Sequence, residues 1–252
     1  MISNGQPAYK IGLIGVVFTL IGFVIGGSIF VLPGELYALA GPAMLLSFLI
    51  ASVPAAGPCL TAAQIAAAFP GNGANVLAVR SLVSPLGGFG VAWFIIGSSI
   101  VALALLALGF ADYLAVVAPS LRGAARPFTA TAVTLLFALL NSFGARAAVV
   151  VQSAMVVWLV LILALFTALA VPYMDVSHFT PFASKGGIAI ATAVIPAFFA
   201  FLGFTLIVEV SGDVEHPART LPLALAISYA VILLAYIGVA AGVVGILPPD
   251  RM

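Results

Sequence analysis

Charge is scarce in this sequence. Of its 252 residues, 8 are Lys or Arg and 7 are Asp or Glu, whereas 64% are hydrophobic. A soluble domain carries about 25% charged residues, because its surface must interact with water. A chain with 6% charged residues cannot form such a surface, which excludes a soluble enzyme and a disordered chain. The basic residues are also scattered, and this excludes nucleic acid as a partner because a phosphate backbone requires a basic face.

Residues that build catalytic or metal sites are equally rare. Cys59 is the single cysteine, so no intrachain disulfide can form. The two histidines, His178 and His216, fall in loops that we expect on opposite sides of a membrane, where they cannot share a metal ion or pair with a serine. We therefore predict no catalytic residue, no metal and no cofactor. The last apolar stretch, 221–247, contains no lysine, which excludes a retinal Schiff base there.

Long hydrophobic stretches dominate the chain. Charges and Pro/Gly clusters divide it into seven apolar segments, each near or above the roughly 20 residues that span a bilayer; they cover 11–39, 42–68, 86–117, 128–143, 147–171, 187–208 and 221–247. The sequence predicts an all-α polytopic membrane protein with about seven transmembrane helices in a single domain over 1–252, surrounded by the lipid bilayer. A short interfacial helix is expected over 74–82. The basic residues divide evenly between the two sides, so they do not indicate an orientation.

Two of these segments contain helix-breaking residues. The first reads VIGGSIFVLPG near its middle and is longer than a straight helix needs to cross a ~30 Å core, which predicts a break at Gly26–Ser28. The sixth has Pro196 and a glycine among phenylalanines, and we expect it to open near Phe201–Gly203. Such a pair of interrupted helices indicates a transporter site, where helix N-termini attract a carboxylate and freed carbonyls accept from an ammonium group. The alternative is that the glycines only permit close helix packing, and the residues alone leave both open.

At these residues the chain resembles the amino acid–polyamine–organocation superfamily of amino acid permeases. GGSIFVLPG at 26–34 is similar to the motif of the family's first helix, and AGPAMLLSF at 40–48 to the start of its second. The stretch from 67 to 80 resembles the loop between helices 2 and 3, and Asn141, Gly144 and Arg146 match the start of helix 5. FFAFLGFTLIVEVSGDVEHPARTLP, 198–222, resembles helix 6 and its exit. The resemblance implies the N-terminal part of a five-plus-five inverted repeat, as in the leucine transporter, with helices 1 and 6 discontinuous.

The resemblance also implies a substrate site at the two breaks. Backbone N–H groups of Gly26, Gly27 and Ser28 would bind the substrate carboxylate. Carbonyls near Ile25, Phe201 and Leu202 would accept from its amino group, beside the break at Gly203. Phe199 occupies the position of an aromatic residue that closes over the substrate in similar antiporters.

Other polar residues are candidates for the transport pathway. Ser98 and Ser99 would line the pocket or form interhelical hydrogen bonds, and Glu209 would line the pathway or pair within the exit of helix 6. Thr205 stands where some permeases of cationic substrates carry an acidic residue, which argues against a dibasic amino acid or a polyamine.

The expected function is secondary transport of amino acids, neutral or small and zwitterionic, across the inner membrane of a bacterium, by alternating access. The alternative is a non-transporting permease fragment or membrane interaction subunit. A five-plus-five fold has ten core helices and this chain supplies seven, so we expect it to be truncated. Its partners would then be further copies of itself or the missing C-terminal helices.

Overall fold

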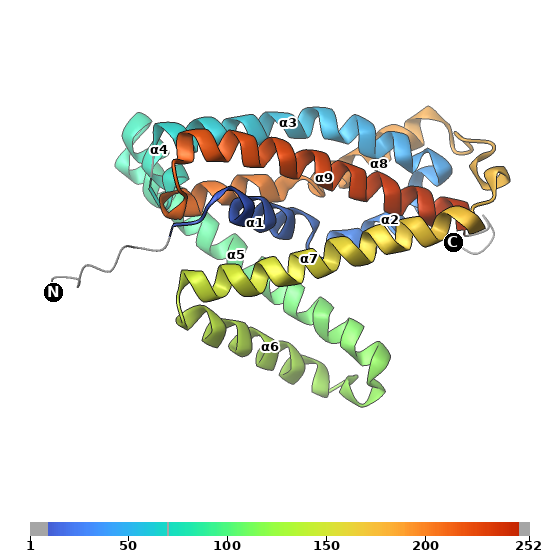
Figure 1. The fold of residues 1–252 in the computed structure, drawn as a ribbon, viewed down its shortest axis with the longest axis horizontal. Coiled ribbons are helices and arrows are strands. Elements are labelled where there is room, and N and C mark those ends of the chain that lie inside the picture. The colour runs from blue at the N-terminus through green and yellow to red at the C-terminus, as the bar shows by residue number, and fades with distance from the viewer. Residues whose placement is uncertain (1–9, 70, 247–252) are drawn as a thin grey trace. The chain divides into compact units, whose positions relative to one another are not determined.

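Helices make up the regular structure of this protein (Figure 1). The computed structural model describes residues 10–69 and 71–246, and within these ranges the only β-type pairing is a single bridge between Ile11 and Val214. The α-helices are α1 (Leu13–Ile25), α2 (Ser28–Ala40), α3 (Met44–Ala68), α4 (Ala74–Leu82), α5 (Pro85–Val117), α6 (Ala125–Ser142), α7 (Ala145–Ala170), α8 (Gly186–Phe199) and α9 (Pro217–Ile246). The 3-10 helices are η1 (Gly41–Ala43), η2 (Pro119–Leu121), η3 (Val171–Tyr173), η4 (Val176–Phe179) and η5 (Leu202–Asp213).

Five stretches of the described residues are long and apolar enough to cross a membrane. They are Ser28–Ala68, Pro85–Val117, Arg146–Tyr173, Gly186–Asp213 and Pro217–Ile246. Their number and length confirm the prediction of an all-α polytopic membrane protein. The count of seven spans stays a prediction, because α1 has 13 residues, α6 has 18, and α2 and α3 fall within one of the five stretches. Residue 247, the expected end of the last span, lies outside the described residues.

The chain folds into two compact units, each described here by itself. The first contains the described residues up to Asn72 and those from Gln152 onward, and the second contains Gly73–Val151. The predicted single domain and its inverted repeat stay predictions. The first unit holds both interrupted helices, and it is therefore the unit that carries the candidate site.

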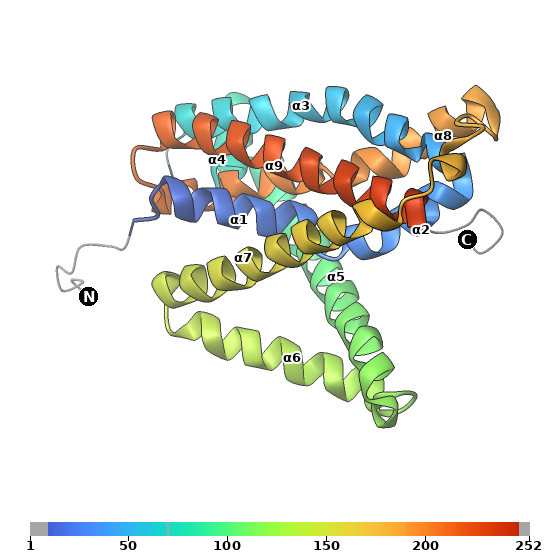
Figure 2. The same ribbon diagram turned by 45° about the vertical axis from the view of Figure 1, so that its right-hand side comes forward.

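In the first unit, α9 lies alongside α1 and α3, and α8 packs against α2 and α3 (Figures 1 and 2). Glycines allow the part of α7 in this unit to approach α1 and α9 closely, as is usual in lipid, where packing rather than water exclusion holds helices together. A Cβ on Gly242 of α9 would come within 2.9 Å of the Phe166 ring of α7, and one on Gly22 of α1 within 3.0 Å of Gln152. The glycines thus set how near α7 stands to α1 and α9.

In the second unit, α5 and α6 are joined through η2 and pack against each other near this turn. Ser84 caps α5 by accepting a hydrogen bond from the Gly87 N–H at 2.9 Å. The short helix α4 packs against the start of α5 and occupies the stretch for which the sequence predicted a helix. Most side chains of α5 are exposed in this unit, including Trp93 and Phe94 at 71% and 77%. Such apolar exposure on a helix of this length is suited to contact with lipid or other helices.

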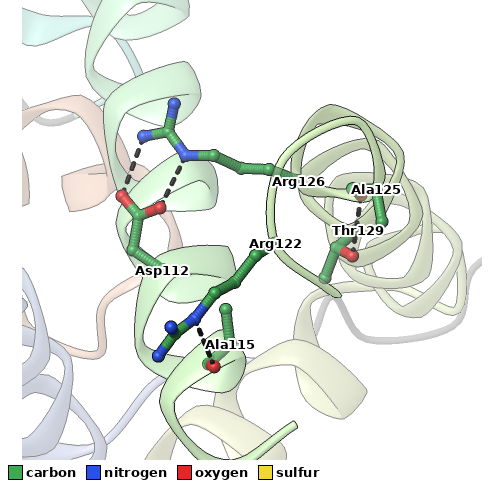
Figure 3. Close-up of polar contacts among 6 residues, drawn as sticks. All are labelled: Asp112, Ala115, Arg122, Ala125, Arg126 and Thr129. Carbon is green, nitrogen blue, oxygen red and sulfur yellow. Dashed lines mark hydrogen bonds and ion pairs between the residues drawn. The ribbon is translucent and has the colours of Figure 1, made fainter. Parts of the chain in front are cut away.

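Polar contacts fix the turn between α5 and α6 (Figure 3). Arg126 donates two hydrogen bonds to Asp112, from Nε at 2.6 Å and from Nη2 at 2.8 Å. Arg122 donates from Nε to the carbonyl of Ala115 at 3.3 Å, in the last turn of α5. That bond places a positive charge at the end of α5, where the helix dipole is negative.

Candidate functional site

The first break separates α1 from α2. Gly26 and Gly27 lie between the two helices, and Gly26 has a φ of 41°, a conformation that residues with a Cβ rarely adopt. The second break follows α8, which ends at Phe199. A turn at Ala200–Phe201 leads into η5, so the chain changes from an α-helix to a 3-10 helix instead of continuing straight. The sequence placed this break slightly later, at Phe201–Gly203.

The two breaks touch through their backbones at Gly203. A Cβ on this glycine would overlap the carbonyl oxygen of Phe23, and it would lie 2.7 Å from the carbonyl carbon of Phe23 and 2.8 Å from the Cα of Val24. All three are main-chain atoms in the last turn of α1. Gly203 therefore brings η5 against the end of α1 at a distance that no larger residue permits.

A hydroxyl group from a third helix connects the two breaks. The Tyr236 hydroxyl of α9 lies 3.2 Å from the carbonyl oxygen of Val24 and 3.1 Å from that of Ala200. It also lies 2.9 Å from the hydroxyl of Ser28, and Ser28 donates to the carbonyl of Ile25 at 2.7 Å. The last carbonyls of a helix lack partners within it, so these side chains satisfy groups that the breaks expose. The sequence prediction did not include Tyr236, although a tyrosine in an apolar helix is a signal in itself, because its hydroxyl needs a partner.

Aromatic contacts hold the Tyr236 ring in place. The ring is fully buried and stacks on Phe48 of α3, with centroids 5.3 Å apart and an interplanar angle of 10°. Phe201 packs edge-on against it at 5.4 Å. Phe201 and Phe204 also stack on Tyr229 at 5.9 Å and 5.5 Å. The position of the Tyr236 oxygen is thus set by rings from two other elements.

The end of η5 is tied to the segment that precedes α1. The N–H of Ile11 donates to the carbonyl of Asp213 at 2.7 Å, and the N–H of Glu215 donates to the carbonyl of Ile11 at 3.0 Å. Lys10 Nζ donates to the carbonyl of Gly212 at 2.6 Å. These bonds connect the far ends of the two interrupted segments.

The loop after α3 joins the same contact. Asn72 accepts from the N–H of Gly212 at 3.0 Å and donates to the Asp213 carboxylate at 3.1 Å, while Ser211 donates to the carbonyl of Gly71 at 3.0 Å. A Cβ on Gly212 would lie 2.7 Å from the N of Asn72, so glycine is required for this approach. We call the contacts among residues 10–11, 71–72 and 211–215 the latch.

The architecture and the paired helix breaks agree with the similarity of the sequence to known proteins. The profile of the amino acid permease family matches residues 11–252. The chain belongs to the amino acid permease family.

Similar permeases differ in what their names say they carry. The chain is 25% identical to the branched-chain amino acid permease BcaP of Bacillus subtilis, over 98% of this chain and 57% of that protein. It is 26% identical to the methylthioribose transporter of the same species, over 100% of this chain and 57% of that protein. It is 30% identical to human cationic amino acid transporter 4, over 86% of this chain and 38% of that protein. The chain thus spans little more than half the length of its bacterial relatives.

Around the first break of the permease, the predicted residues lie together. Ile25 is buried, Gly27 and Ser28 are half-buried, and Gly26 is exposed. Ser28 begins α2, so backbone N–H groups at this helix start lack intrahelical acceptors. The roles that the sequence assigned to these four residues stay predictions. The carbonyl of Ile25 already accepts from Ser28, and the carbonyl that faces Tyr236 belongs to Val24.

At the second break, too, the carbonyl that faces Tyr236 belongs to the residue before a predicted one. Phe201 is buried, and Leu202 and Gly203 are half-buried. The carbonyl that faces Tyr236 belongs to Ala200, whereas that of Leu202 accepts from the Thr205 hydroxyl at 3.1 Å. Val24 and Ala200 are therefore the residues whose carbonyls face Tyr236, each one position before a predicted residue.

The remaining predicted residues belong to α5, α8 and η5. Phe199 is 63% exposed and its ring packs edge-on against Phe198 at 6.2 Å. Ser98 and Ser99 are exposed on α5 in the second unit, and the Ser98 hydroxyl donates to the carbonyl of Ile95 at 3.0 Å. Glu209 is half-buried within η5. Their roles in closure or in the pathway stay predictions.

At the opposite end of the first unit, the loop before α8 holds the end of α9. The N–H of Asp175 donates to the carbonyl of Gly245 at 2.9 Å, and His178 Nδ1 lies 2.9 Å from the same oxygen. Hydrogen bonds from the side chain and the backbone N–H of Ser177 lower the pKa of Asp175. Among the described residues, no group of three or more His, Cys, Asp or Glu side chains is placed to hold a metal ion.

Proposed function

We propose that this permease carries amino acids across a membrane and binds them between the two helix breaks. The convergence of two helix ends on one hydroxyl carries this proposal. The C-terminal ends of α1 and α8 bring the carbonyls of Val24 and Ala200 within 3.2 Å of the Tyr236 oxygen. Helix C-termini carry partial negative charge, and both the dipoles and the freed carbonyls favour an ammonium group at this point.

The start of α2 supplies the complementary charge. Its first residue is Ser28, and its N–H groups and dipole favour an anion such as the substrate carboxylate. A site with acceptors on one side and N–H donors on the other matches a zwitterion. The names of the branched-chain amino acid permease and of the cationic amino acid transporter agree with this substrate class.

The latch supports alternating access. Backbone bonds join the segment before α1 to the end of η5, and both segments lead directly to the breaks. We propose that opening the latch exposes the breaks to one side of the membrane, and that opening the other end exposes them to the other side. We place the protein in the inner (plasma) membrane of a bacterium, because the two Bacillus subtilis permeases match 98% and 100% of the chain.

Uptake of labelled L-leucine into proteoliposomes tests the proposal. Wild-type protein should accumulate the label, and Gly27→Leu should abolish uptake because a large side chain would occupy the start of α2. Gly57→Ala is the matched control, since nothing lies within 4 Å of a Cβ at that position in α3. Equal uptake by wild type and Gly27→Leu would contradict the assignment of the site.

A second candidate is a membrane subunit that acts with other helices or with copies of itself. The exposed apolar side chains of α5, among them Trp93 and Phe94, favour it because such a surface is suited to contact with other helices. This candidate would be supported if the isolated chain bound substrate without uptake. Uptake should then appear once the chain is reconstituted with a partner.

A further inference from the structure

The network at the breaks has more acceptors than protons. A serine or tyrosine hydroxyl carries a single hydrogen that it can donate. The hydroxyls of Ser28 and Tyr236 lie within hydrogen-bond distance of the carbonyls of Val24, Ile25 and Ala200, and of each other. Two protons cannot fully serve three carbonyl oxygens, so the network is short of donors at the two helix ends.

A primary ammonium group supplies the hydrogen-bond donors that this network lacks. It brings three N–H donors and no acceptor, and its hydrogen bonds are about twice as strong as those of a neutral hydroxyl. It also carries the charge that two helix C-termini favour. An ammonium group therefore binds the carbonyls of Val24 and Ala200 better than the Tyr236 hydroxyl can.

We propose that the Tyr236 hydroxyl is an internal substitute for the ammonium group of the substrate. This inference rests on the proposed function. Without substrate, the Tyr236 proton serves the carbonyls of Val24 and Ala200 and holds the two breaks together. An arriving ammonium group takes over both carbonyls, and the Tyr236 proton turns away from them.

The packing of the ring determines how this exchange occurs. Tyr236 is stacked on Phe48 and contacted edge-on by Phe201, so the ring stays in place. Rotation of the hydroxyl hydrogen about the C–O bond is enough to release the carbonyls. The Tyr236 hydrogen then points to the Ser28 oxygen, 2.9 Å away, while Ser28 keeps its own hydrogen on the Ile25 carbonyl and the Tyr236 oxygen accepts from the ammonium group. Tyr236 is thereby a specificity-determining residue, because a ligand must donate better than a phenol to displace it.

The test compares two tyrosines of one aromatic cluster. Tyr236→Phe removes the hydroxyl and keeps the ring contacts. Tyr229→Phe is the matched control, because its hydroxyl also donates to a main-chain carbonyl, that of Ser52 in α3, which belongs to neither break. Binding of L-leucine to the purified chain is measured from the rise of the Tm with ligand concentration. L-2-hydroxy-4-methylpentanoate, which has a hydroxyl in place of the ammonium group, is the second probe.

Loss of the competing hydrogen bond should tighten binding of L-leucine to Tyr236→Phe by about fivefold, while the Kd of Tyr229→Phe should stay within about twofold of wild type. Both variants should have a lower Tm without ligand. Wild type should bind the hydroxy acid at least about tenfold more weakly than L-leucine.

Unchanged or weaker binding of L-leucine by Tyr236→Phe would overturn the inference, since Tyr236 would then be a structural contact or a direct ligand. Equal wild-type affinity for L-leucine and the hydroxy acid would also overturn it, and so would the absence of binding to both wild type and Tyr236→Phe. Tighter binding to Tyr236→Phe without uptake by any variant would support the inference and contradict the proposed transport activity.

Discussion

Replacing Gly203 with alanine should destabilise the permease, because the added methyl group meets the main chain of α1. The nearest atoms to that Cβ are the carbonyl oxygen and carbon of Phe23 and the Cα of Val24, with the last two at 2.7 Å and 2.8 Å. Ordinary contacts of a Cβ begin near 3.4 Å. Main-chain atoms of a packed helix cannot turn aside as a flexible side chain can, so η5 and α1 must move apart.

Overpacking of this kind costs about 1–3 kcal/mol. In a chain of this size each kcal/mol lowers the Tm by about 2–4 °C. The measurement is thermal unfolding of purified protein in detergent, followed by tryptophan fluorescence or by loss of the monodisperse peak after heating. Uptake should fall as well, because separation of η5 from α1 moves the carbonyls of Val24 and Ala200 apart.

Gly57→Ala controls for the effect of glycine on helix stability. Its Cβ has nothing within 4 Å, so the substitution should be neutral or should stabilise α3 by up to about 1 kcal/mol. A Gly203→Ala protein with the Tm of wild type would refute the close approach of the two backbones. A Tm that falls equally in both variants would refute the assignment of the cost to this contact.

Three further substitutions test other contacts. Ser28→Ala removes the bond to the Ile25 carbonyl and should cost about 0.5–1.5 kcal/mol and raise the KM for uptake; an unchanged Tm and KM would contradict a role at the break. The pKa of Asp175 is lower in the folded state than in the unfolded state, so the ionised Asp175 carboxylate stabilises the fold. This stabilisation is present above the unfolded-state pKa and is lost as the pH falls from about 5 through the folded-state pKa. The Tm of Asp175→Asn should therefore lie below that of wild type at pH 7 and approach it at pH 3, and a gap that widens toward acid would contradict this sign. Asp112→Asn breaks the exposed pair with Arg126 and should change the Tm little, and less still at high salt; a large loss of stability would mean that the pair is shielded from solvent.

Much of the fold could be predicted from composition and pattern. The shortage of charge and the length of the apolar stretches required helices in a bilayer, because lipid offers no partner for an open backbone. Gly26 and Gly27 indicated the first break, and the positive φ of Gly26 is a backbone conformation that residues with a Cβ rarely adopt. The second break was predicted slightly too late in the chain, at Phe201–Gly203, whereas α8 ends at Phe199 and a turn at Ala200–Phe201 leads into the 3-10 helix. That boundary depends on packing of η5 against α1 and α3, which a local pattern does not contain.

The sequence by itself therefore determined that this protein lies in a lipid bilayer, that it is helical and which family it belongs to. It also determined approximately where two of its helices are interrupted. These follow from local preferences and from the cost of burying unpaired polar groups. Only the tertiary structure decided which groups meet at the interruptions. Tyr236 is more than 200 residues from Val24 and Ser28, and hydropathy does not distinguish a tyrosine that faces lipid from one that joins two helix ends. The packing of α9 against α1 and α3 places its hydroxyl there, and it selects the carbonyls of Val24 and Ala200 over their neighbours.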